Sequence, residues 1–169
     1  MGILTIGSHL IAKQDSHNIV ECLDSCEGLV DFTVVAVDSR PESDETFNLI
    51  KDRKNTFCYR QKWEDSFATA RNNSLKTLLD LRPDVNFILW VDSDDQWQQT
   101  GNNCAPHEEI RKRLEDLKPE AVNNIYIYAK TIYSKTPNNK LNIDHDSIMI
   151  NCFCCRSKFL FKSMILNQP

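Results

Sequence analysis

Within residues 1–97, continuous apolar runs alternate with segments in which apolar residues recur every three or four positions. The runs at 3–11, 32–38 and 86–92 are typical of buried strands, and 57–59 predicts a shorter strand. The segments between them predict helices, because their apolar residues share one helical face. Alternating strands and helices predict right-handed βαβ units. The sequence therefore predicts an α/β fold with a Rossmann-like, mostly parallel sheet and helices on both faces.

The expected helices carry recognisable end signals. We expect Asp15 and Ser16 to cap the first helix and Gly28 to follow its end. Ser66 is expected to cap a longer helix that stops before Pro83. One stripe of that helix holds Phe67, Ala70, Ser74, Leu78 and Leu81. These signals place the helices that should cover the sheet.

The chain changes character after residue 97. A polar stretch at 96–106 predicts a loop, and the next helix should bury Ile110, Leu114 and Leu117. Its charges, such as Arg111 with Glu115, are spaced to form solvent-facing pairs. Strand-like runs follow at 124–133 and 147–155, joined by a turn around Pro137. We find no repeat or linker, so a single domain over 1–169 is expected.

Composition excludes several classes of protein. Of the 169 residues, 41% are hydrophobic and 26% charged, which favours a packed core over disorder. The net charge of −4 argues against binding to nucleic acid or to anionic membranes through bulk charge. No apolar run is long enough for a membrane span. The abundance of Asn, Ile and Lys indicates an AT-rich genome, such as that of a large DNA virus or a parasite.

The cysteines and the N-terminal segment favour a cytoplasmic protein over a secreted one. The cysteine count of 7 is odd, and no basic segment precedes the first apolar run, which therefore predicts a strand rather than a signal peptide. A secreted disulfide framework would favour an even count. We expect a cytoplasmic protein with reduced thiols. The run Cys152, Cys154 and Cys155 lacks a second ligand cluster at zinc spacing and is interpreted as part of a strand.

Carboxylates follow two of the predicted strands. Asp38 ends one, and 92–95 (DSDD) follows another. Neither a G-x-G-x-x-G nor a Walker phosphate loop occurs. Carboxylates repel a phosphate unless a divalent cation lies between them, so this pattern favours Mg²⁺ or Mn²⁺. Asp-x-Asp alone is a weak signal and is more often a solvated turn or a helix cap, but its place after the apolar run 88–91 favours the metal site. A dehalogenase-type phosphatase would need Thr where Gln96 stands.

Several segments together resemble glycosyltransferase family 2, whose catalytic domain has the GT-A fold. They match, in order, an apolar strand with a following polar triplet, a C-L-x-S helix, a V-D-rich strand, a W-x-D-D-F-S-x-A-R-N segment and a D-A-D-D turn. The matching segments are 11–15 (IAKQD), 22–25 (CLDS), 30–39 (VDFTVVAVDS), 43–46 (SDET), 63–72 (WEDSFATARN) and 89–95 (LWVDSDD). The resemblance implies a nucleotide-binding half at 1–97 and a shortened acceptor-side half at 98–169.

The resemblance also implies site residues and an activity. Nucleotide contacts are implied for Ala12, Asp15, Asp38, Arg71 and Asp92, and a Mn²⁺ or Mg²⁺ site for Asp92 and Asp94. The implied reaction is metal-dependent, inverting transfer of a sugar from a nucleotide-diphosphate donor to a hydroxyl acceptor. UDP is the favoured donor nucleotide, because it is the most frequent one in the family.

Each of these residues also has a plainer interpretation. Arg71 could pair with Asp38 or Asp92, and Asp15 could act only as a helix cap. The aromatic residues Trp63, Phe67 and Trp90 are expected in the core rather than as sugar-binding platforms.

The chain departs from the family pattern in two places. The base-binding loop holds Arg40, Pro41 and Glu42 where the family has Gly-Ser, and Leu166-Asn167 replaces the usual His-Glu. No general base can therefore be assigned, although Asp144 and Asp146 are spare carboxylates. Two alternatives stay open: a degenerate, non-catalytic domain that keeps the nucleotide site, and one half of an enzyme completed by a partner chain.

Overall fold

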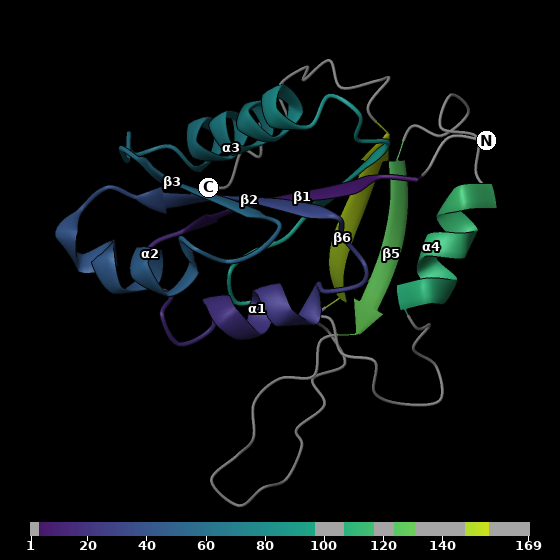
Figure 1. Cartoon of the computed structure of the whole chain (residues 1–169), viewed down its shortest axis with the longest axis horizontal. Helices are drawn as coiled ribbons and strands as arrows, with labels where there is room; N and C mark the ends of the chain where they lie inside the picture. The colour runs from purple at the N-terminus through teal and green to yellow at the C-terminus, as the bar shows by residue number, and fades with distance from the viewer. Residues whose placement is uncertain (1–3, 97–106, 117–123, 131–147, 156–169) are drawn as a thin grey trace, which may run out of the picture.

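Six strands form one mixed sheet in the computed structural model, which describes residues 4–96, 107–116, 124–130 and 148–155 (Figure 1). The strand order is β3-β2-β1-β4-β6-β5. The strands are β1 (Ile6–Ala12), β2 (Phe32–Asp38), β3 (Thr56–Gln61), β4 (Phe87–Trp90), β5 (Asn124–Lys130) and β6 (Ile148–Cys155). Neighbours among β1 to β4 are parallel, whereas β6 runs antiparallel to β4 and to β5. The expected Rossmann-like, mostly parallel sheet is confirmed.

Helices cover both faces of this sheet. In Figure 1, α3 lies on one face, and α1 and α2 lie on the other. The helices are α1 (Ile19–Ser25), α2 (Asp44–Ile50), α3 (Phe67–Leu81) and α4 (His107–Asp116), with a 3₁₀ turn, Pro41–Ser43, before α2. Ser66 caps α3 as predicted, because its hydroxyl accepts a hydrogen bond from the Thr69 N–H.

Three groups of buried apolar side chains hold the layers together. One group joins α3 to the sheet through Leu75 and Leu78, which pack with Val34 and Ile88. A second joins α1 and α2 to β1 and β2, and a third joins α1 and α4 to β1 and β4. Each side chain buried in this way stabilises the fold by about 2 kcal/mol. The parallel strand ends are thereby held in a fixed arrangement, which the candidate site requires.

Gly7 leaves no room for a side chain between β1 and α3. A Cβ atom there would lie 2.9 Å from Val85 Cγ2 and 3.0 Å from both methyl carbons of Leu78. We expect Gly7→Val to lower the free energy of unfolding by about 2 kcal/mol, because overpacking forces neighbouring side chains off their rotamers. Chemical denaturation measures this loss. Leu78→Ala should relieve part of it in the double variant, and strictly additive losses would contradict the packing explanation.

Some element boundaries differ from those predicted. The first strand extends to Ala12, and Asn18, rather than Asp15 or Ser16, occupies the N-cap position of α1. The β4 strand ends at Trp90, so Asp92 lies in a turn. Gly28, predicted at the C′ position directly after the C-cap of the helix, lies one residue further on, because Cys26 is the C-cap of α1; its φ is positive, at 81°. The turn around Pro137 lies outside the described residues.

Arg111 contradicts the prediction that the charges of α4 all face solvent. Its guanidinium donates to the carbonyl oxygens of Leu29, at 2.8 Å, and Leu4, at 3.1 Å, and it pairs with Asp31 at 3.2 Å. These acceptors come from segments beside the sheet that are distant in the sequence. Helical spacing alone therefore placed Arg111 beside Glu115, whereas the tertiary structure offers it more acceptors.

Two further observations concern the membrane and the thiols. Within the described ranges, no helix is both long and apolar enough to cross a membrane. Among the described residues, Cys22, Cys26 and Cys58 are free thiols, and the cytoplasmic location stays a prediction.

Candidate functional site

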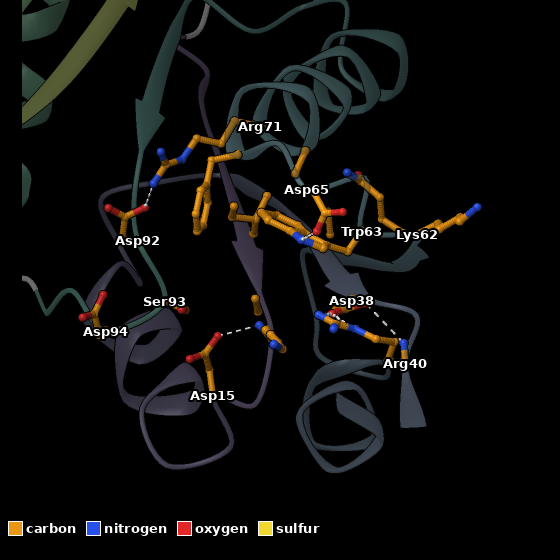
Figure 2. A pocket seen from close by; sticks show the side chains of 17 residues that line it. Asp15, Asp38, Arg40, Lys62, Trp63, Asp65, Arg71, Asp92, Ser93 and Asp94 are labelled. Carbon is orange, nitrogen blue, oxygen red and sulfur yellow. Dashed lines mark hydrogen bonds and ion pairs between the residues drawn. The ribbon is translucent and has the colours of Figure 1, made fainter. Parts of the chain in front are cut away.

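A cavity of about 610 Å³ opens at the carboxyl ends of β1, β2 and β4 (Figure 2). Ligands of open α/β sheets bind at this edge. All residues with an implied site role line it: Ala12, Asp15, Asp38, Arg71, Asp92 and Asp94. They come from segments as far apart as β1 and the turn after β4. Their convergence on one cavity is the main structural observation about the site.

The turn after β4 presents Asp92 and Asp94 to the cavity. Asp95 shapes this turn, because its Oδ2 accepts from the Asp92 N–H at 3.0 Å while its own N–H donates to the Asp92 carbonyl at 3.0 Å. Burial, followed by the nearby carboxylates of Asp92 and Asp94, raises the pKa of Asp95. No separate role was predicted for Asp95. The D-x-x-D spacing was the available signal, since Asp side chains often bond to backbone within a turn.

Arg71 connects α3 to this turn. Its Nη2 donates to Asp92 Oδ1 at 2.8 Å, and the guanidinium lies 4.4 Å from the centre of the Trp90 ring. Of the two pairings considered for Arg71, the structure has the one with Asp92. The Trp90 Nε1–H donates to the same Asp92 oxygen at 3.3 Å. The side chain of Asp92 is therefore oriented before any ligand arrives.

Asp38 and Arg40 form an ion pair on the opposite side of the cavity from Asp92 and Asp94 (Figure 2). The Arg40 Nε–H donates to Asp38 Oδ2 at 2.7 Å, its Nη2 donates to the same oxygen, and its backbone N–H donates to Oδ1 at 3.2 Å. The Arg40 guanidinium holds the pKa of Asp38 below its usual range. Asp38, implied as a base contact, is thus occupied by a neighbour two residues away.

Asp15 lies in the loop after β1, where two backbone contacts position it. Its Oδ2 accepts from the Lys13 N–H at 2.7 Å, and its own N–H donates to Thr46 Oγ1 at 2.9 Å. The side chain therefore shapes the loop and lines the cavity instead of capping α1.

The aromatic residues differ from their predicted place in the core. Phe67 is 62% exposed, and Trp63 and Trp90 are only half-buried. Trp63 and Phe67 meet edge to face, with ring centres 4.8 Å apart, at the wall of the cavity. The Trp63 indole N–H also donates to Asp65 Oδ1 at 2.9 Å. The expectation of a core role is wrong for Phe67, because this first residue of α3 lies at the open wall of the cavity rather than under the helix.

His9 is a buried titratable group behind the cavity. It lies on β1 beside Trp90, with ring centres 6.5 Å apart, and its Nδ1 has no partner among the described residues. Burial, followed by the charge of Arg71, lowers the pKa of His9 to about 4. The imidazole is therefore neutral near pH 7.

The donor atoms at the turn fit a divalent cation that is shared with a phosphate. No three His, Cys, Asp or Glu side chains in the described part of the chain lie close enough to hold a metal alone. Asp94 is exposed at the cavity, and both side-chain contacts that Asp92 makes there go to Oδ1. Two carboxylates of this kind suit Mg²⁺ or Mn²⁺, which take oxygen ligands and complete their shell with water and substrate phosphates. Binding by Asp92 and Asp94 stays a prediction.

Comparison with known proteins gave matches among solved structures only. No protein-family model matches the chain, and no curated protein matches it significantly. Two crystal structures of S. aureus TarS match with TM-scores of 0.42 and 0.48, identities of 22% and 19%, and coverage of 55% and 67% of this chain. The matched regions amount to 28% and 20% of the two TarS chains, so this chain spans less than a third of the length of either.

A third match is 4-diphosphocytidyl-2C-methyl-D-erythritol synthase from Anaerococcus prevotii. Its TM-score is 0.48 and its identity 10%, over 91% of this chain and 72% of the synthase. All these identities lie below 25% and all TM-scores below 0.5, so the likenesses assign neither a family nor an activity to this chain.

Proposed function

We propose that this chain is a GT-A-like transferase that binds a nucleotide-diphosphate sugar in the cavity and moves the sugar to a hydroxyl acceptor. The observation that carries the proposal is the convergence of Ala12, Asp15, Asp38, Arg71, Asp92 and Asp94 on one cavity at the carboxyl edge of the sheet. The diphosphate would lie at Asp92 and Asp94 and the nucleoside toward Asp38. These positions are two strands apart, roughly 10 Å, which leaves room for a ribose between base and diphosphate.

The residues of the turn have distinct tasks in this proposal. Asp92 and Asp94 would hold Mn²⁺ or Mg²⁺, which as a Lewis acid offsets the charge of the departing diphosphate. Arg71 keeps Asp92 oriented through the 2.8 Å contact, and Asp95 keeps the turn closed through its two bonds to Asp92. Because these groups are oriented before binding, less entropy is lost when a ligand binds.

The proposed transfer inverts the configuration at the anomeric carbon of the sugar. The acceptor oxygen forms a bond to the anomeric carbon while the bond between that carbon and the diphosphate oxygen breaks. The electron pair of the broken bond leaves with the diphosphate. The acceptor hydroxyl must also lose its proton to a general base. Leu166-Asn167, Asp144 and Asp146 lie outside the described residues, so that role stays unassigned.

One observation favours the alternative of a nucleotide-binding domain without turnover. Five carboxylates of the described residues line the cavity: Asp15, Asp38, Asp65, Asp92 and Asp94. All except Asp94 already accept a hydrogen bond from the protein. A carboxylate that already accepts a hydrogen bond has fewer free lone pairs with which to accept the proton of an acceptor hydroxyl. Binding of a nucleotide without sugar release is the result that would establish this alternative.

Titration calorimetry of the purified chain tests the proposal. UDP, CDP, GDP and dTDP are titrated with and without Mn²⁺, and the corresponding nucleosides serve as controls without a diphosphate. We expect at least one diphosphate to bind about tenfold or more tightly with Mn²⁺, because the cation relieves repulsion between phosphates and carboxylates. Absence of binding to all four diphosphates would overturn the proposal. Slow release of sugar from the matching nucleotide sugar then separates an enzyme from a binding domain.

A further inference from the structure

Arg40 determines which hydrogen-bonding groups face a base at the Asp38 side of the cavity. The carboxylate of Asp38 is only 4% exposed and receives three hydrogen bonds from Arg40, whereas the Arg40 side chain is 43% exposed. A ligand in the cavity therefore meets the guanidinium of Arg40 before the carboxylate of Asp38. Both residues line the cavity.

The free hydrogen atoms of Arg40 define what this side can recognise. Nε–H and one Nη2–H are directed at Asp38 Oδ2, which occupies one flank of the guanidinium. The remaining hydrogen atoms, on Nη1 and Nη2, form a second fork that donates no hydrogen bond within the described residues. The carboxylate of Glu42 pairs with Nε, at 3.6 Å, and not with this fork. Such a fork matches two adjacent acceptor atoms in a plane. Figure 2 shows the guanidinium of Arg40 directed toward the middle of the cavity.

The two common pyrimidines differ at the edge that would meet this fork. Cytosine presents two adjacent acceptors, O2 and N3. Uracil presents an N3–H donor between its two carbonyl oxygens, so the fork would meet a donor at that position. A buried donor that faces another donor loses its hydrogen bond, and this loss disfavours binding. A free Asp38 carboxylate would have the opposite preference, because it accepts from N3–H and repels an N3 lone pair.

We propose that Arg40, by covering Asp38, makes the cavity select cytosine over uracil. This inference rests on the proposed function, because it requires a nucleoside diphosphate in the cavity. It departs from the expectation of UDP that the family resemblance carries. Removal of the guanidinium should expose the carboxylate and shift the preference toward uracil.

Calorimetric titration of CDP and UDP in the presence of Mn²⁺ tests the inference. The two ligands share ribose and diphosphate, so their affinity ratio isolates the base. We expect the unmodified chain to bind CDP about tenfold more tightly than UDP. Arg40→Met should abolish or reverse this ratio. Arg40→Lys keeps a cation beside Asp38 but lacks the fork, so it should fold and show a reduced ratio.

Lys62→Met is the matched control, because Lys62 also contributes a positive charge to the cavity lining. It should weaken CDP and UDP alike and leave their ratio unchanged. Equal or tighter binding of UDP by the unmodified chain would overturn the inference and leave the proposed function standing. A ratio unaffected by both Arg40 variants would overturn it as well. Absence of binding by all four nucleoside diphosphates would overturn both proposals.

Discussion

Asp92→Asn combined with Asp94→Asn is expected to lower nucleoside diphosphate affinity in the presence of Mn²⁺ by about a hundredfold or more. Substitutions beside a metal ligand already cost 10- to 100-fold in metal affinity, and this variant replaces both proposed ligands. An amide oxygen is neutral, so it attracts a divalent cation far less than a carboxylate does. Calorimetric titration with and without Mn²⁺ measures the effect, and the difference between the two conditions should vanish.

The control for this variant removes the same charge elsewhere. Asp52→Asn with Asp80→Asn changes two exposed carboxylates outside the cavity lining and should leave the Mn²⁺ effect intact. The two single variants separate an effect on binding from an effect on folding. Asp92→Asn also removes the carboxylate that pairs with Arg71, so it should affect both. Asp94 is exposed, so Asp94→Asn should affect binding alone. Undiminished Mn²⁺-dependent binding in the double variant would disprove the metal assignment.

Protonation of His9 is expected to make the fold sensitive to mild acid. The pKa of His9 is about 4 in the folded chain and 6.5 in an unfolded one. Between these values the unfolded state binds the proton and the folded state does not. The free energy of unfolding therefore falls as the pH is lowered from about 6.5 to about 4, and it rises again when the pH is restored. The full difference corresponds to about 3 kcal/mol, which is a large part of a typical domain's stability.

Chemical denaturation in metal-free buffer at several pH values between 4 and 7 measures this dependence. Asp95 acts in the opposite direction, because its raised pKa lets the folded state bind a proton more readily than the unfolded state. The comparison variant His9→Gln removes the titrating group but keeps Asp95 and the other histidines. Its stability should decline less than that of the unmodified chain over the same range. Parallel curves for the two proteins would refute the role of His9.

Much of the fold could be predicted because the signals were local. The apolar run at 32–38 coincides with β2, since a strand buried on both faces is apolar throughout. The apolar spacing and Ser66 gave α3 its limits, because capping and periodicity depend on near neighbours. Five of the six implied site residues end or follow β1, β2 or β4, and they share one cavity for a similar reason: parallel strands bring their carboxyl ends to the same edge.

Other features required the tertiary structure, because they depend on groups that are far apart in the sequence or on exposure. Arg71 had two candidate partners, and only the packing of α3 against β1 and β2 places its guanidinium beside Asp92. Arg111 donates to acceptors more than 75 residues earlier in the chain, and helical spacing cannot predict contacts over such a separation.

Residue types and their order along the chain therefore determined where acidic groups meet at the sheet edge. Whether each of those groups is free or engaged was decided only by the folded chain. Asp38 is the clearest example. The sequence pattern identifies it as a strand-end carboxylate, but its burial beneath Arg40 changes which hydrogen-bonding groups the cavity presents to a ligand. The physical reason is that hydrogen-bonding capacity is finite, and the fold distributes it among neighbours before any ligand binds.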